Sequence, residues 1–329
     1  MGEELGVLGE PITSLQNAVV KRAAGLRLRK FREREGAFLA EGADLVAAGI
    51  AAGRRPQVVL VRSGSVAEAA AAGAVPGGLE TGGAGAPAIV PAALAGLTVY
   101  PVSDRVAAKV STLETAPDVM AVFPLPERAP LEVLREGGAG RPGTGGPAPL
   151  VVFADRIADP GNMGTLLRAA AAFGAAALVA APASVDLFGP KTVRASMGAV
   201  FALPLFQDVT LGELAARLGG PRVYGLVAHG GVPLAEAELR RPAVLCVGAE
   251  RAGLAPETLA QVTDRLTIEL APAQSQSALA EAGGVAGAET GAGPSAAVES
   301  LNAGVAGAIA LYEFARRARG GAAAPPEKG

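Results

Sequence analysis

Between residues 150 and 320, short apolar runs alternate with segments whose apolar positions recur at helical spacing. The apolar runs predict strands at LVVFADRI, AALVA, FALPLF, RVYGLVA, VLCVGA and LTIEL. Strands that are apolar throughout are typical of parallel sheets covered by helices on both faces. Residues 150–320 therefore predict an α/β domain with a parallel sheet, which ends in an amphipathic helix over Ser300–Arg319.

Residues 12–125 predict a smaller α/β unit. The segment SLQNAVVKRAAGLRLRKF has the pattern of one helix, with Ser14 or Asn17 near its N-terminal cap. A second helix is predicted at ADLVAAGIAAG, and strands are predicted at FLAEG, QVVLVRS, TVYPVS and DVMAVFP. A stretch rich in Gly and Pro follows, and we place the linker between the two domains at residues 126–149.

Two further segments contain too few large apolar residues to contribute to a core. Gly73–Pro91, within the first domain, is rich in Gly, Ala and Pro and is typical of a flexible excursion. Ala271–Val298, within the second domain, is of low complexity and unusually long for a loop. We therefore expect it to be a mobile insertion between the last strand and the closing helix.

The scarcity of cysteine and histidine excludes several kinds of site. The chain has 329 residues, enough for about two domains, but only one Cys and one His. A single cysteine excludes an internal disulfide and Cys-cluster metal sites, and Cys246 is expected to be a buried apolar residue. A single histidine, His229, excludes multi-His metal sites and leaves a Ser-His or Cys-His hydrolase only one possible base. No metal is expected.

The charge and the start of the chain indicate a cytoplasmic protein without an obvious affinity for nucleic acid. MGEELGVLGEPITSLQN does not have the pattern of a secretory signal, and the most apolar stretch, Ala169–Ala183, is too short for a membrane span. The net charge is −2, yet Lys21–Arg34 holds seven basic residues and one acidic residue. On charge alone, a solvated helix face explains this run better than a phosphate-binding patch.

The candidate chemistry lies where the predicted parallel strands end, the place where such sheets bind ligands. Three groups of residues follow these strands: ADRIADPGNMGTLLRAAAAFG (Ala154–Gly174), VGAERAGL (Val247–Leu254), and the pair formed by IEL (Ile268–Leu270) and SLN (Ser300–Asn302). In the first group, Asn162 has the position of a helix cap and Arg168 lies within the first two turns of the helix. Each group alone is also compatible with an ordinary capped helix or turn.

The three groups together, in this order, closely resemble the signature motifs of the SpoU/TrmH family of RNA ribose 2′-O-methyltransferases, in the SPOUT superfamily. The first motif is D-P-G-N-x-G followed by Arg168 and F-G, the second is G-x-E-x-x-G-L, and the third is I-x-L followed by E-S-L-N and L-Y-E. KTVRASMGAVFALPL (Lys191–Leu205) also resembles a family segment, and the first domain is similar to a substrate-binding domain found in many members.

The resemblance implies a fold and a reaction that composition does not reveal. It implies a deep trefoil knot in the C-terminal third of the chain, with S-adenosylmethionine held there by Gly248, Ile268 and Leu301. It implies transfer of the cofactor's methyl group to a ribose 2′-hydroxyl. The polar residues available for this step are Asn162, Arg168, Glu250, Ser300 and Asn302.

We expect Arg168 to have the central role among these residues. In this family the arginine has been proposed to act as a base. A guanidinium stays protonated, however, so we expect Arg168 to bind the adjacent phosphate and to stabilise the developing alkoxide. Asn162 and Asn302 would orient the ribose or the loops, and Glu250 would hold either Arg168 or the knot loop in place.

The resemblance also changes the interpretation of the basic run. Within a substrate-binding domain, RNA contact by Lys21, Arg22, Arg27, Arg29 and Lys30 becomes the better prediction. The separate first domain favours ribosomal RNA as the substrate, and family members are usually homodimers. Two alternatives stay open, a tRNA 2′-O-methyltransferase and a non-catalytic RNA-binding protein of the same fold.

Two departures from the family pattern concern the third motif. The 271–298 insertion separates Ile268 from Leu301, which usually lie close together in the sequence. Ile-Glu-Leu replaces the usual Ile-Pro-Met, and Ala303-Gly304 replaces the more usual Val-Ser. Backbone contacts tolerate such changes because the peptide groups are retained.

Overall fold

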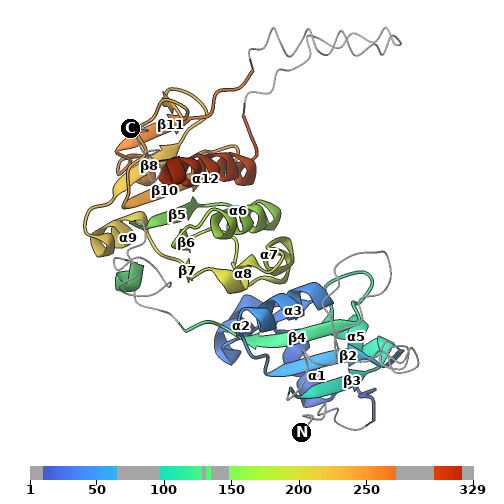
Figure 1. Ribbon diagram of the computed structural model, residues 1–329. Coiled ribbons are helices and arrows are strands. Elements are labelled where there is room, and N and C mark those ends of the chain that lie inside the picture. Colours follow the sequence, from blue (N-terminus) through green and yellow to red (C-terminus); the bar gives the residue numbers. More distant parts are fainter. Residues whose placement is uncertain (1–9, 65–96, 128–130, 135–147, 272–299, 321–329) are drawn as a thin grey trace, which may run out of the picture. The chain divides into compact units, whose positions relative to one another are not determined.

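The computed structural model describes residues 10–64, 97–127, 131–134, 148–271 and 300–320, which form two compact units (Figure 1). Unit 1 contains the chain up to Ala129 together with Val185–Ala202, and unit 2 contains Pro130–Ser184 and the chain from Leu203 onward. The predicted excursion at 73–91, nearly all of the insertion at 271–298 and most of the 126–149 linker lie outside the described residues.

Unit 1 is built on a four-stranded mixed sheet. The strand order is β1(Ala37–Glu41), β4(Val119–Pro124), β2(Val58–Arg62), β3(Val99–Val102). Only β2 and β3 are parallel, and β4 is antiparallel to both of its neighbours. The helices assigned to this unit are α1(Ala18–Gly25), α2(Arg29–Glu35), α3(Ala43–Ala51), α5(Asp104–Val110), α7(Pro190–Ala195) and α8(Ala199–Ala202). The four strands match the four apolar runs predicted from the sequence.

The single helix predicted over residues 14–31 is wrong, because the structure has two helices there. The Asn17 side chain accepts a hydrogen bond of 2.8 Å from the Val19 N–H and caps α1, as expected. Leu26 ends α1 and is fully buried, and Leu28 is extended before α2 begins. A side chain on Gly25 would come within 2.9 Å of the Phe31 ring, so the glycine permits this close turn.

Val185–Ala202 packs into unit 1 although it lies between two strands of the second sheet. Arg32, which is 4% exposed, pairs with Asp186 at 2.5 Å. Arg194 pairs at 2.9 Å with Glu41, whose side chain is 1% exposed. A cluster of aromatic rings completes this packing; its members are Phe38, Phe123, Phe188 and Phe201. Buried ions need such partners, since an unpaired buried charge is strongly destabilising.

Unit 2 is built on a seven-stranded parallel sheet, which confirms the predicted α/β class. Its strand order is β7(Leu205–Gln207), β6(Ala177–Ala180), β5(Leu150–Asp155), β10(Ala243–Gly248), β8(Arg222–Leu226), β11(Asp264–Thr267), β9(Val232–Pro233). Each neighbouring pair is parallel. The helices of this unit are α6(Pro160–Ala172), α9(Leu211–Leu218), α10(Pro256–Leu259), α12(Ala303–Gly320) and the short η2(Leu131–Leu134). The trefoil knot stays a prediction.

Helices cover both faces of this sheet (Figure 1). Leu211, Leu214 and Leu218 of α9 share a core cluster with Phe153 and with Cys246, which is fully buried as expected. Burial raises the pKa of the Cys246 thiol, so the thiol stays protonated. No helix in the described part of the chain is long and apolar enough to cross a membrane.

On the opposite face, two glycines bring α12 close to α6. A Cβ on Gly304 would lie 3.0 Å from the Asn162 carbonyl oxygen, and a Cβ on Gly307 would lie 2.5 Å from Leu166. Side chains at these two positions would push the helices apart. The close approach matters for function because it brings Asn302, just before α12, next to the start of α6.

The C-terminal half of α12 is tied to the loop after β9. Arg317 donates hydrogen bonds to the carbonyl oxygens of Leu234, Ala235 and Ala237. Glu313 accepts hydrogen bonds from both Arg316, at 2.7 Å, and Arg317, at 2.5 Å. These donors, Arg316 foremost, lower the pKa of the Glu313 carboxyl to about 2.

We expect Glu313 to make the protein acid-sensitive. Its folded pKa lies below the unfolded value of about 4.3, so its contribution is complete above that value and is lost as the pH falls towards about 2. The contribution should be about 1 kcal/mol, because the Arg316 side chain is 56% exposed and water screens its charge. Urea unfolding at pH 6, 4 and 3 measures it. Glu313→Gln should show the flatter profile, and equal pH profiles for the two proteins would contradict the assignment.

Candidate functional site

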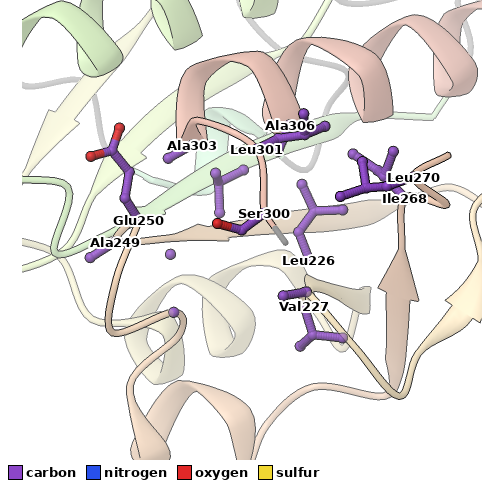
Figure 2. A pocket seen from close by; sticks show the side chains of 14 residues that line it. Leu226, Val227, Ala249, Glu250, Ile268, Leu270, Ser300, Leu301, Ala303 and Ala306 are labelled. Atoms are coloured by element: carbon purple, nitrogen blue, oxygen red, sulfur yellow. The ribbon is translucent and has the colours of Figure 1, made fainter. Parts of the chain in front are cut away.

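The three sequence motifs meet at the carboxyl ends of β5, β10 and β11. Gly248 of β10 lies opposite Asp155 of β5 in the strand register, so the loops that follow these strands are neighbours. A pocket opens between the loop after β10, the ends of β8 and β11 and the start of α12 (Figure 2). Its lining residues are Leu226, Val227, Ala228, Val247, Gly248, Ala249, Glu250, Gly253, Ile268, Leu270, Ser300, Leu301, Ala303 and Ala306.

The pocket has apolar walls and few polar side chains. Figure 2 shows Glu250 at one end, Ile268 and Leu270 at the other, and Ser300 and Leu301 between them. The three predicted cofactor residues, Gly248, Ile268 and Leu301, all line this one pocket. Their side chains are small or apolar and carry no charge. The polar groups of a ligand would therefore hydrogen-bond mainly to backbone peptide groups and to the Ser300 hydroxyl.

Gly248 is the tightest point of the pocket wall. A Cβ at this position would lie 2.3 Å from the Gly253 carbonyl carbon and 2.5 Å from the Leu254 nitrogen. The loop folds back on itself here, because Ala249 and Gly253 exchange two backbone hydrogen bonds, of 3.1 and 2.7 Å. Only glycine fits at residue 248 while the loop keeps this shape.

Asn162, Glu250 and Asn302 form one hydrogen-bonded cluster at the Glu250 end of the pocket. The Asn302 amide donates to Asn162 Oδ1 at 2.6 Å and to Glu250 Oε1 at 2.8 Å. The Asn162 amide also donates to Glu250 Oε1. The three residues come from three different motifs, so this cluster joins α6, the loop after β10 and the start of α12.

The expected cap at Asn162 is wrong, because Asp159 caps α6 instead. The Asp159 carboxylate accepts a 2.8 Å hydrogen bond from the Asn162 backbone N–H, and Pro160 occupies the first helical turn. Aspartate suits a helix N-terminus because its charge also complements the helix dipole. The Asn162 side chain is therefore available for the cluster, and it is 8% exposed.

Arg168 lies on the exposed face of α6, six residues after Asn162. Among the described residues it has no hydrogen bond or ion pair, so its guanidinium is available for a ligand. Of the two roles expected for Glu250, the geometry favours holding the loop, since Glu250 contacts Asn162 and Asn302 and not Arg168.

Sequence reasoning missed the pocket residues at the end of β8. Leu226, Val227 and Ala228 line the pocket, although RVYGLVA carries no polar signal. Their position follows from the strand order, in which β8 lies between β10 and β11. No group of three His, Cys, Asp or Glu side chains in the described ranges could hold a metal ion.

The candidate RNA-binding residues lie on α1, on α2 and between them, in unit 1. Arg22 pairs with Glu35 at 3.2 Å, Arg29 pairs with Glu33 at 2.9 Å, and Arg27 donates to two backbone carbonyl oxygens. Lys21 and Lys30 are exposed and form no ion pair with other described residues, although the Lys30 ammonium lies 5.9 Å from the centre of the Phe31 ring. The free positive charge is therefore smaller than the composition of the run indicates.

Two protein families match the chain. The model of the SpoU rRNA Methylase family matches residues 149–286, and the model of the MRM3-like substrate binding domain matches residues 17–121. A relative from Bacillus subtilis, the 23S rRNA (guanosine(2553)-2′-O)-methyltransferase RlmP, is 28% identical over 246 residues, which are 74% of this chain and 84% of RlmP.

Solved structures resemble more than nine tenths of the chain. A putative RNA methyltransferase of the TrmH family from Porphyromonas gingivalis is 30% identical, with a TM-score of 0.64, over 92% of this chain and 100% of that one. An AdoMet-bound rRNA methyltransferase from Sinorhizobium meliloti is 26% identical, with a TM-score of 0.66, over 95% and 98% of the two chains. The motif geometry, the two family models and these full-length matches agree: the chain belongs to the SpoU/TrmH family of RNA 2′-O-ribose methyltransferases.

Proposed function

We propose that this methyltransferase uses S-adenosylmethionine bound in the pocket at Gly248, Ile268 and Leu301 to methylate a ribose 2′-hydroxyl of ribosomal RNA. The observation that carries the proposal is the hydrogen-bonded cluster of Asn162, Glu250 and Asn302 beside that pocket. The substrate class is supported by RlmP, which is named for methylation of 23S rRNA, and by the domain that matches residues 17–121.

The residues of the pocket fit this cofactor. Apolar walls suit the adenine ring and the carbon chain, and Glu250 and Ser300 place polar groups along the lining. When bound, the cofactor supplies a sulfonium methyl group, whose bond to sulfur breaks as the bond to the ribose oxygen forms and the hydroxyl proton passes to water. The solved Sinorhizobium meliloti relative, which holds AdoMet, supports the same choice.

The chain's own residues would place the ribose and stabilise its charge. A 2′-hydroxyl is a weak nucleophile, so orientation against the methyl group supplies much of the rate. Asn162 and Asn302 hydrogen-bond to each other and to Glu250, which ties them to the pocket loop, and from this position they would orient the sugar. Arg168 would bind the adjacent phosphate and the developing alkoxide, and because its guanidinium stays protonated it is not a base.

Mapping 2′-O-methyl groups in ribosomal RNA tests the function directly. Purified protein, radiolabelled S-adenosylmethionine and unmodified ribosomal RNA should give one methylated ribose, and transfer RNA under the same conditions should give none. Methylation of transfer RNA alone would favour a tRNA 2′-O-methyltransferase. Tight RNA binding with no measurable affinity for the cofactor would favour a non-catalytic RNA-binding protein.

RNA binding is expected to depend on Lys21 and Lys30, the two lysines of the basic run, which form no ion pair with other described residues. Lys21→Ala with Lys30→Ala should weaken RNA binding and reduce the slope of log K against log salt by about one for each phosphate that is no longer neutralised. Filter binding between about 50 and 200 mM salt measures both effects. Arg54→Ala removes an exposed cation of unit 1 outside Lys21–Arg34 and serves as the control. Unchanged binding in the double variant would argue against this surface.

The expected homodimer would use unit 2. Val305, Ile309 and Tyr312 recur at helical spacing on the outer side of α12 and are 43%, 37% and 53% exposed. Thr165 and Arg168 are exposed on the neighbouring helix α6. Grouped exposed apolar side chains are typical of association surfaces. The homodimer and the cytoplasmic location expected from the sequence stay predictions.

A further inference from the structure

Asp155 is a buried carboxylate outside the pocket that holds the pocket's main loop. It is the last residue of β5, it is 2% exposed, and it does not line the pocket. Its Oδ2 accepts a 2.6 Å hydrogen bond from the Ala255 backbone N–H. Arg156 Nε lies 3.7 Å from its Oδ1. A buried carboxylate is costly unless such partners stabilise it, so the bond to Ala255 offsets part of the cost of burying Asp155.

Ala255 ends the loop that forms one wall of the pocket. Gly248, Ala249, Glu250 and Gly253 all line the pocket and all precede Ala255 on this loop. Within the loop, Ala249 and Gly253 exchange two backbone hydrogen bonds, which close residues 249–253 into a turn.

Two sets of side-chain hydrogen bonds attach this compact loop to the rest of unit 2. On the pocket side, Glu250 contacts Asn162 and Asn302. At the far end, Asp155 holds the Ala255 N–H. Leu254 packs in the core at the same end, so loss of the second attachment would shift the loop without releasing it. The wall at Gly248 and Gly253 would then move without any change in the residues that line it.

We propose that Asp155 is a positioning residue, which sets the affinity of the pocket for S-adenosylmethionine through its hydrogen bond to Ala255. This inference rests on the proposed function, because it assumes that the pocket binds this cofactor. It goes beyond that function by assigning the position of the loop to a residue that touches neither cofactor nor RNA.

Two substitutions separate the hydrogen bond from the burial of charge. Asp155→Leu keeps the branching at Cγ but is larger and removes the acceptor, whereas Asp155→Asn removes the charge and keeps both the volume and an acceptor for Ala255. We expect Asp155→Leu to weaken S-adenosylmethionine binding about tenfold and Asp155→Asn to stay within about threefold of the parent protein. Calorimetric titration of the full chain with the cofactor alone measures both values.

Glu41→Gln provides the matched control. Glu41 is also a buried and hydrogen-bonded carboxylate, but it lies in unit 1, where it accepts from Ser111, Thr112 and Arg194. Its substitution should leave cofactor affinity unchanged. Parent-like affinity in Asp155→Leu would overturn the proposal. Equal weakening in both Asp155 variants would also overturn it, because charge and not the bond to Ala255 would then be responsible.

Hydrogen exchange gives a second readout that does not require a stable Asp155→Leu protein. In the unsubstituted chain, S-adenosylmethionine should slow exchange of the Ala255 amide, since the Asp155–Ala255 bond and the pocket are coupled. Unchanged exchange at Ala255 on cofactor binding would overturn the proposal. Failure of the proposed function would give another result. The parent protein would then bind the cofactor and exchange the Ala255 amide more slowly, and yet methylate no ribosomal RNA.

Discussion

Arg168→Ala is expected to reduce methyl transfer to RNA about 10²–10³-fold while leaving cofactor binding unchanged. This magnitude is typical of removing one donor that stabilises a developing negative charge. Arg168 is exposed on α6 and does not line the pocket, so its loss should not alter the cofactor's surroundings. Single-turnover methylation with saturating RNA measures the chemical step, and a separate cofactor titration confirms that the pocket is intact.

Two companion variants make the Arg168 result specific. Arg168→Lys keeps the charge but loses the planar fork that binds a phosphate through two parallel hydrogen bonds, so it should recover only part of the activity. Arg217→Ala removes an exposed arginine from α9, where it pairs with Glu132, and should retain full activity. Near-normal methyl transfer by folded Arg168→Ala would show that the central role belongs to another residue.

Most strands of both units could be predicted because local patterns determine them, but β9 was missed and the first two residues of FALPLF lie in α8. The runs LVVFA (Leu150–Ala154) and VLCVGA are apolar throughout, and in the structure β5 and β10 lie side by side in the middle of the sheet. The division of residues 14–31 into two helices could not be predicted. It depends on the burial of Leu26 and on the close approach of Gly25 to the Phe31 ring, which are tertiary interactions.

The packing of Val185–Ala202 in unit 1 could not be predicted either. It depends on pairs such as Arg32 with Asp186, 154 residues apart, and Arg194 with Glu41, 153 residues apart. In the linear pattern, a basic run such as Lys21–Arg34 looks uniformly solvated. Arg32, however, is buried within it, because its partner comes from a distant segment.

The sequence predicted which residues belong to the candidate site, but not which of them hydrogen-bond to one another. Motif resemblance selected Asn162, Glu250 and Asn302, and the structure joins all three in one cluster. Which of them bonds to which depends on how α12 lies against α6. That packing is permitted by Gly304 and Gly307, which stand at the start of a helix whose first residues are only small and apolar.

Gly248→Ala is expected to weaken S-adenosylmethionine binding about 100-fold and to abolish methyl transfer at ordinary cofactor concentrations. The new methyl group would lie 2.3 Å from the Gly253 carbonyl carbon and 2.5 Å from its oxygen, and backbone atoms cannot rotate away as a side chain can. The loop must therefore move by about 1 Å. A displacement of that size costs about 10²-fold in the rate of a positioned reaction, and we expect a similar loss in cofactor affinity because the moved loop is the pocket wall. Calorimetric titration measures the affinity.

Gly212→Ala is the control for adding one methyl group to unit 2. At Gly212, in α9, a Cβ would lie 3.5 Å from the Gln261 side chain, which is an ordinary van der Waals distance. Alanine also favours a helix more than glycine does, so this variant should bind the cofactor normally and unfold no more easily than the parent. The Gly248→Ala protein should lose about 1–3 kcal/mol of stability through overpacking, and urea unfolding must show that it still folds. Normal cofactor affinity in that folded variant would mean that the pocket at Gly248 is not where the cofactor binds, and the assignment of Ile268 and Leu301 would fail with it.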